Sequence, residues 1–325
     1  MTLIEPKVEI IDESNPLKKI EIAGRTCYKS EANITDESAQ KFFRTLTKNN
    51  HTAMLEHATF VFQTHREDIY INCCRNKYFN CSEVHFVSVD VNKKDEQVDS
   101  ARYIISANLR AILESRNMFL ICPLYRYNPD IVYLDTETNE LLREYIDYIN
   151  PDDIKVIDIN DIDFIHTEEV DKHIYTTMRF TCDRGVTHEI VRHRPFSFAQ
   201  ESTRYVNYTK EQNGNGDIKF IKPADFDNWS EALKAVFISS LERAEDSYNM
   251  MIGNGAVAQE ARAVLPNAVK TEIVITGNHS QWKHFFNLRS FGTTGKPHPD
   301  MKKVADIALS IYPLKDDLID DEIGL

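Results

Sequence analysis

The sequence of 325 residues lacks the marks of a membrane or secreted protein. It contains no run of about 18 apolar residues, so we expect no transmembrane helix. Its first residues, MTLIEPKVEIIDES, show no basic end followed by an apolar stretch, so we expect no secretory signal. The six cysteines have no framework spacing, which favours reduced thiols in a cytoplasmic protein.

The familiar motifs of nucleotide and hydrolase sites are also missing. The chain has no G-x-G-x-x-G and no G-x-x-x-x-G-K-S/T, so a Rossmann or P-loop site is not supported. It has no G-x-S-x-G nucleophile elbow. His51, Glu56 and His57 fit neither H-E-x-x-H nor H-x-x-E-H, so we expect no metal. A metal hydrolase built on these three residues stays a third alternative.

Basic residues are fewer than acidic ones, 38 against 51, and the net charge is −13. The stretch 130–171 carries −12 and the tail 316–322 carries −5, which leaves +4 for the remainder. A general nucleic-acid binder needs a basic face, so this balance argues against one. A mildly basic body still leaves room for a local anion site. The acidic runs are interpreted as solubilising surface.

The hydrophobic pattern predicts a chain of mixed helices and strands. Apolar residues at helical spacing predict a helix over 37–48, and a long amphipathic helix follows Ser230 and ends at Gly253. Residues 8–22 are interpreted as short extended pieces with a turn around Pro16. Further strands are expected at 60–62, 175–180 and 272–275, and further helices at 186–194, 257–265 and 281–289.

The most informative segment is rich in arginine. Guanidinium groups match phosphate oxygens in pairs, and hydroxyls and loop N–H groups complete such a cradle. A basic helix end is the simpler interpretation of any single arginine. For the whole set an anion site is favoured, because like charges this close repel unless an anion or carboxylates such as Glu189 and Glu201 offset them. The segment contains Arg192, His193, Arg194, Ser197, Ser202 and Arg204.

Two distant arginines join this hypothesis. Arg262 is flanked by small and apolar residues, and a buried ion pair is an equal alternative for it. Arg289 lies on the apolar face of its predicted helix, four residues after Phe285. We favour a functional role for Arg289, because Asn278 precedes the same helix and His284 lies on its outer side.

The arrangement resembles the flavin-dependent thymidylate synthase (ThyX) family. Its motif RHR-x2-S-x4-S-x-R is met at all six fixed positions of the arginine-rich segment. The resemblance covers roughly residues 35–60 and 173–300. The other matching segments are His51-x4-Glu56-His57, Ala261-Arg262-x2-Leu265-Pro266-x4-Thr271 and Asn278-x5-His284-Phe-x2-Leu288-Arg289.

The resemblance implies a fold and an assembly. The family fold is α+β, with a central mixed or antiparallel sheet and long helices. We expect one domain over 1–325 with a lineage-specific acidic insertion at about 63–172, where no motif matches. The resemblance also implies a homotetramer whose sites are shared between subunits, with no nucleic-acid or membrane partner.

The resemblance further implies a reaction. Such enzymes convert dUMP to dTMP with bound FAD, NADPH as reductant and methylenetetrahydrofolate as one-carbon donor, and they need no cysteine nucleophile. Arg289 would be the catalytic residue, stabilising negative charge on the uracil ring electrostatically. The alternative is a non-catalytic nucleotide or RNA phosphate-binding protein, which predicts salt-sensitive binding without flavin.

The matching positions give a set of expected contacts, several with unusual residues. Ala53 stands where many members have Ser or Thr, Gln200 where others have Glu, and Ser280 where some have Arg. Expected at FAD are Arg192, His193, Arg194, Gln200, Asn278, Ser280, His284 and Ala53. Expected at dUMP are Glu189, Arg192, Gln200, Glu201, Ser202, Thr203, Arg204, Arg289 and, from another subunit, Arg262.

Overall fold

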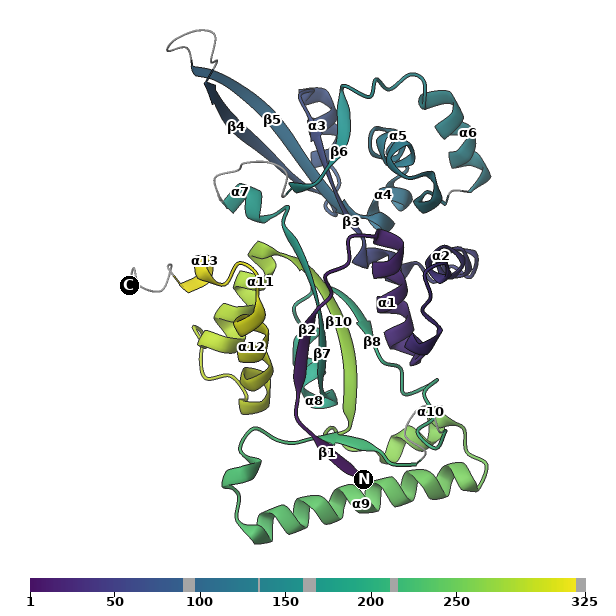
Figure 1. Ribbon diagram of the computed structural model, residues 1–325, viewed down its shortest axis with the longest axis vertical. Coiled ribbons are helices and arrows are strands. Elements are labelled where there is room, and N and C mark those ends of the chain that lie inside the picture. Colours follow the sequence, from purple (N-terminus) through teal and green to yellow (C-terminus); the bar gives the residue numbers. More distant parts are fainter. Residues whose placement is uncertain (90–96, 134, 160–167, 211–215, 320–325) are drawn as a thin grey trace.

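The computed structural model of the chain describes residues 1–89, 97–133, 135–159, 168–210 and 216–319 (Figure 1). Its described strands form two four-stranded antiparallel sheets and one two-stranded parallel sheet. They are β1 (Thr2–Ile4), β2 (Lys7–Ile10), β3 (Thr59–Thr64), β4 (Asn80–Val89), β5 (Gln97–Asn108), β6 (Ile154–Ile157), β7 (Tyr175–Asp183), β8 (Ser197–Gln200), β9 (Lys219–Ile221) and β10 (Lys270–Asn278).

The helices are mostly short, and none in the described part is long and apolar enough to span a bilayer. They are α1 (Pro16–Tyr28), α2 (Ser38–Lys48), α3 (Glu67–Cys74), α4 (Leu109–Ser115), α5 (Met118–Tyr127), α6 (Thr136–Tyr145), α7 (Glu168–Asp171), α8 (Arg184–Ile190), α9 (Glu231–Gly253), α10 (Ala258–Ala261), α11 (His279–Phe286), α12 (Pro299–Ile311) and α13 (Asp316–Ile319).

The sheet with strand order β2-β7-β10-β8 lies at the centre of the molecule, with helices on both faces (Figure 1). Successive side chains of a strand point to opposite faces. Ile273 and Ile275 of β10 therefore pack in one core with the aromatic residues of α11, while Val274 packs against Ala23 of α1. The arginine-rich segment predicted from the sequence lies at this sheet, since α8 directly follows β7 and β8 is its edge strand.

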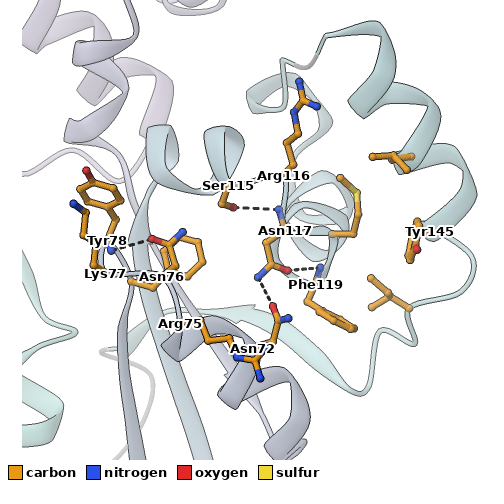
Figure 2. Close-up of a pocket in the computed structure, with 14 residues that line it drawn as sticks. Asn72, Arg75, Asn76, Lys77, Tyr78, Ser115, Arg116, Asn117, Phe119 and Tyr145 are labelled. Atoms are coloured by element: carbon orange, nitrogen blue, oxygen red, sulfur yellow. Dashed lines mark hydrogen bonds between the residues drawn. The ribbon is translucent and has the colours of Figure 1, made fainter.

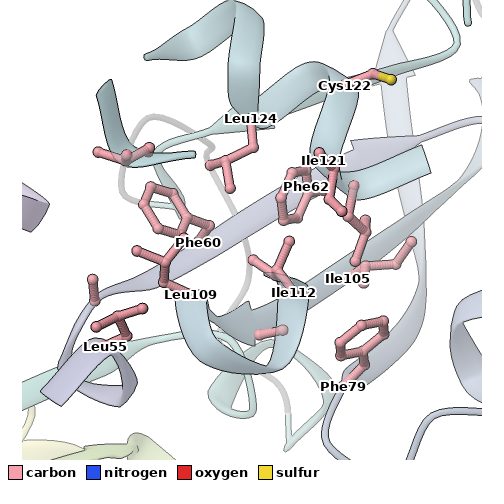
Figure 3. Close-up of a cluster of buried hydrophobic side chains, with 14 of the residues drawn as sticks. Leu55, Phe60, Phe62, Phe79, Ile105, Leu109, Ile112, Ile121, Cys122 and Leu124 are labelled. Carbon is pink, nitrogen blue, oxygen red and sulfur yellow. The ribbon is translucent and has the colours of Figure 1, made fainter. Parts of the chain in front are cut away.

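The sheet with strand order β4-β5-β3-β6 lies above α1 in the view of Figure 1, and helices α3 to α6 lie around it. Its core joins residues of the predicted insertion to residues outside it (Figure 3). Leu55 and Phe60 precede the insertion, and they share one apolar cluster with Ile105, Leu109 and Ile121. Residues of the stretch 63–172 therefore share one apolar core with residues that precede it.

The expected α+β class with antiparallel sheets is confirmed. The helix over 37–48 is confirmed as α2, and the long helix after Ser230 is confirmed as α9, with the Ser230 side chain accepting from the backbone N–H of Leu233. The strands expected at 60–62, 175–180 and 272–275 are confirmed as β3, β7 and β10. The sequence Asn213-Gly-Asn-Gly216 also indicates a turn or loop, and it lies outside the described residues apart from Gly216.

Three local predictions need correction. Pro16 begins helix α1, because proline suits the first helical position and the Asn15 side chain caps the N–H of Leu17 at 2.9 Å. The helix predicted over 186–194 ends earlier, at Ile190, five residues before Pro195. The helix predicted over 281–289 ends at Phe286 and continues as a π-helical turn, Asn287–Phe291.

Candidate active site

The turn from β7 into α8 presents the first half of the arginine-rich segment. Asp183 caps α8, since its carboxylate accepts a 2.8 Å hydrogen bond from the N–H of Val186. The helix is short, so Glu189, Arg192 and His193 emerge together at its C-terminal end. Strand β8 then starts four residues after His193 and pairs with β10.

Arg289 reaches this end of α8 from the turn after α11, a helix that shares one apolar core with α8. Its Nε donates to Nε2 of His193 at 3.0 Å, and its NH1 group donates to the Glu189 carboxylate at 2.7 Å. The π-helical turn that carries Arg289 follows α11 directly, and π-turns occur frequently at functional sites. The three predicted site residues therefore form one connected group.

His193 is buried and uncharged in this arrangement. Burial, reinforced by the positive charge of Arg289, lowers its pKa to about 4. Because Nε2 accepts the hydrogen bond from Arg289, the ring proton lies on Nδ1. The imidazole ring is 5.1 Å from the ring of Phe285 and 6.0 Å from that of His284. Aromatic packing thus fixes its orientation.

Helix α11 places the other predicted flavin contacts. Asn278 caps this helix by accepting from the N–H of Gln281 at 3.0 Å, and its amide donates to the carbonyl of Lys172 at 3.0 Å. Ser280 is half-buried in the first turn, and His284 is exposed at the end near His193. Asn278 is buried, so its side chain serves the helix within a single protomer.

The second half of the motif forms a separate group around Ser202, Thr203 and Arg204. Arg262 donates to the hydroxyl of Thr203 at 3.3 Å, so these two predicted nucleotide contacts meet within one chain. The guanidinium of Arg204 lies 5.2 Å from the ring of Tyr205. Among the described residues, no hydrogen bond or ion pair joins this group to Arg289.

Glu201 is buried, unlike Arg204 and Tyr205, which follow it in the segment and are exposed. Its carboxylate lies 2.9 Å from Lys270 and 3.8 Å from Lys29, and Tyr208 donates to it at 3.2 Å. Glu272 pairs with the same two lysines, which overcome the effect of burial and lower its pKa to about 2. The charges of this buried cluster are satisfied internally.

Gln200 and Ala53 complete the predicted contacts. The Gln200 amide donates to the hydroxyl of Thr187 at 2.9 Å, which ties β8 to α8. Ala53 is exposed on the 3-10 helix Thr52–His57. In the same segment Nδ1 of His57 lies 2.9 Å from the hydroxyl of Thr276, and the ring is fully buried.

Within the described part, no group of three or more potential ligands is placed to hold a metal ion.

Four motif arginines have exposed guanidinium groups without a carboxylate partner anywhere in the described part of the chain. Exposed cations concentrated in this way attract anionic ligands. These four are Arg192, Arg194, Arg204 and Arg262.

Two lysines that neutralise Glu201, Lys29 and Lys270, were not predicted from the sequence. No local signal reveals them, because Lys29 follows α1 and Lys270 begins β10, far apart along the chain. Tyr175 was also not predicted, and its hydroxyl accepts from the Asn80 amide at 2.6 Å, which links the start of β4 to β7.

Comparisons with known proteins decide the family. The model of the family described as "Thymidylate synthase complementing protein" matches residues 9–72 and 161–312. The chain belongs to this family. The matched ranges contain every predicted site residue and leave 73–160 unmatched.

Individual relatives of the chain match over a smaller part of it. A flavin-dependent thymidylate synthase of Geobacter sulfurreducens is 37% identical over 106 residues, covering 33% of this chain and 43% of the relative. One of Mycobacteroides abscessus is 32% identical over 165 residues, covering 43% of this chain and 62% of the relative. The chain thus spans about half the length of these curated relatives.

Two solved structures show weaker similarity. The UMP/dUMP methylase PolB of Streptomyces cacaoi, bound with 5-Br dUMP, has a TM-score of 0.41 and 14% identity, covering 99% of this chain and 97% of its own. Thymidylate synthase X of Helicobacter pylori, with FAD and dUMP, has a TM-score of 0.37 and 19% identity, covering 46% and 74%. The assignment to the family therefore comes from the family model.

Proposed function

We propose that this chain is a flavin-dependent thymidylate synthase, which converts dUMP to dTMP with methylenetetrahydrofolate as one-carbon donor and NADPH as reductant via FAD. The observation that carries the proposal is the contact of Arg289 with His193 and Glu189, beside a set of unpaired arginines, inside the ranges that match the family. The names of the curated relatives support the same activity.

The nucleotide dUMP would be bound by the two groups of arginine. Arg204 and Arg262 have no carboxylate partner in the described chain, so each can meet a phosphate oxygen, and Ser202 and Thr203 add hydroxyls. Arg289 would stabilise negative charge on the uracil ring electrostatically, as a guanidinium held in place before the substrate arrives. Glu189, Arg192, Gln200 and Glu201 belong to the same proposed substrate set.

The residues proposed for FAD fit an anionic cofactor. Arg192 and Arg194 are exposed and unpaired in the described chain, and the exposed His284 lies beside the neutral His193. Bound FAD would supply the reducing equivalents, which fits an activity without a cysteine nucleophile. The full proposed set is Arg192, His193, Arg194, Gln200, Asn278, Ser280, His284 and Ala53.

We propose a homotetramer with sites shared between subunits. In the described part of one protomer the Arg204 and Arg289 groups share no hydrogen bond or ion pair, so a neighbouring chain can complete each of them. Helix α9 supports this arrangement, because it exposes Leu233, Val236 and Met250. Arg262, which contacts Thr203 in its own chain, is exposed enough to reach a nucleotide as well.

We also propose a single domain over 1–325 with an insertion at about 63–172. The unmatched stretch 73–160 supports the insertion, and the shared apolar core supports one domain. A cytoplasmic location is part of the proposal, supported by six unpaired cysteines.

The alternative is a nucleotide or RNA phosphate-binding protein without catalysis, which the same unpaired arginines allow. An absorption spectrum of the purified protein separates the two. A flavoprotein absorbs in the blue and near-ultraviolet, and NADPH together with dUMP should bleach that band. A colourless protein that takes up no added FAD would contradict the proposed synthase and leave salt-sensitive phosphate binding as the better account.

A further inference from the structure

A pocket of about 700 Å³ lies in the predicted insertion (Figure 2). Its walls come from the end of α3 and the turn after it, from the α4–α5 connection, and from α6 with the turn that follows. The lining residues fall between 72 and 149, a stretch of which the family model matches only the first residue. The volume is that of a small-molecule site, which typically measures ~300–1,000 Å³.

Hydrogen bonds hold the walls of this pocket together. The Asn117 side chain caps α5 by accepting from the N–H of Phe119 at 3.0 Å, and its amide donates to Asn72 of α3 at 3.1 Å (Figure 2). Arg116, between α4 and α5, has a left-handed φ of 53° and pairs with Asp135 and Glu137. The α4–α5 connection is therefore held by α3 through Asn117 and by the start of α6 through Arg116.

The charge of the lining is opposite to that of its surroundings. The stretch 130–171 carries −12, yet the described residues that line the pocket include three cations and no carboxylate. Arg75 and Lys77 form no ion pair in the described chain. Two uncompensated cations in the lining of one pocket attract an anion.

The rest of the lining suits a flat apolar ring. The lining includes the buried side chains of Phe79, Met118 and Ile149, and the more exposed rings of Tyr78 and Tyr145 at opposite ends (Figure 2). The Nζ of Lys77 lies 5.0 Å from the centre of the Tyr78 ring. Aromatic faces beside unpaired cations recognise a stacked ring with a negatively charged tail.

We propose that this pocket binds a planar heteroaromatic anion, in which a ring stacks on Tyr145 and a phosphate or carboxylate tail meets the unpaired cations Arg75 and Lys77. A nucleoside monophosphate and a folate both have this chemistry. The site lies outside the proposed nucleotide site, and neither proposal depends on the other.

The test is calorimetric titration of the full-length protein with dTMP and, separately, with folic acid. The protein carries Arg204→Ala, which weakens nucleotide binding at the proposed active site. At least one ligand should bind once per chain, and Arg75→Ala/Lys77→Ala should lower that affinity at least roughly tenfold. Binding of dTMP would show that the pocket takes a nucleoside monophosphate, and binding of folic acid would show that it takes a folate.

Two variants make the result specific. Arg143→Ala removes an exposed cation of α6 that does not line the pocket, so the affinity should stay within roughly twofold. Tyr145→Ala removes an aromatic wall without changing charge and should also weaken binding. Circular dichroism checks that each variant is folded. If neither ligand binds at millimolar concentration, or if Arg143→Ala weakens binding as much as the double variant, the proposal is overturned.

Discussion

The carboxylate of Glu189 and the guanidinium of Arg289 form a 2.7 Å ion pair across 100 residues of sequence. The same guanidinium donates to His193, so one arginine is held by a charged acceptor and a neutral one. This arrangement keeps Arg289 oriented without burying an unpaired charge, which is the condition that electrostatic preorganisation requires.

Replacing Arg289 should separate catalysis from flavin binding. Arg289→Ala is expected to retain FAD and to lower turnover of dUMP by at least roughly 10²–10³-fold, because the proposed uracil stabiliser is lost. Flavin absorbance of the purified variant and an assay of dTMP formation measure the two effects. Arg289→Lys keeps the charge but loses the paired geometry, so its activity should lie in between. Near wild-type turnover of Arg289→Ala would remove the catalytic assignment.

Substitution of Gly277 tests how closely strand β10 packs against the aromatic residues next to His193. A Cβ atom at this buried position would lie 2.1 Å from the ring of Phe196, which packs 6.2 Å from the ring of His193. Gly277→Ala should therefore lower the free energy of unfolding by about 1–3 kcal/mol in urea titrations. The matched control is Gly253→Ala at the end of α9, where a Cβ meets nothing within 4 Å. A control that loses as much stability as Gly277→Ala would refute the steric argument.

Substitution of Tyr175 tests the hydrogen bond that links Asn80 of the predicted insertion to strand β7 of the central sheet. Tyr175→Phe removes the acceptor of the Asn80 amide, so we expect a loss of about 1–3 kcal/mol in the free energy of unfolding. Tyr103→Phe is the control, because its hydroxyl makes no hydrogen bond within the described chain. Equal stability of the two variants would mean that the Asn80 contact contributes nothing.

Stability should fall in mild acid because of three buried histidines. Burial lowers the pKa of His57, His173 and His193 from 6.5 to about 4. Between these values the unfolded state binds more protons than the folded state, so the free energy of unfolding rises with pH. It should decline by up to ~1.4 kcal/mol per pH unit for each histidine as the pH falls from 6.5 to 4.

Urea unfolding at several pH values measures this dependence. The effect of Glu272 can be distinguished from that of the histidines, because the pKa of Glu272 is lowered to about 2. Its contribution to the free energy of unfolding is therefore lost only as the pH falls from about 4.5 to 2. A free energy of unfolding that stays constant between pH 6.5 and 4 would show that the histidines are not buried as described.

Several elements of the fold could be predicted from local sequence. The positions of β7, β10 and the long helix α9 follow from hydrophobic spacing and a capping serine, which act over a few residues. The helix at Pro16 was missed because a proline is equally at home in a turn and at the first helical position. The π-helical turn at Arg289 has no local signature.

The sequence by itself determined which residues are available: the arginine-rich motif, its register and, through them, the family. Only the tertiary structure decided how they are used. Because β10 pairs with both β7 and β8, it brings Arg289 to Glu189 and His193, and Lys270 to Glu201. Ion pairing depends on distance in space, and only the folded sheet sets which arginines are neutralised and which stay free for an anion.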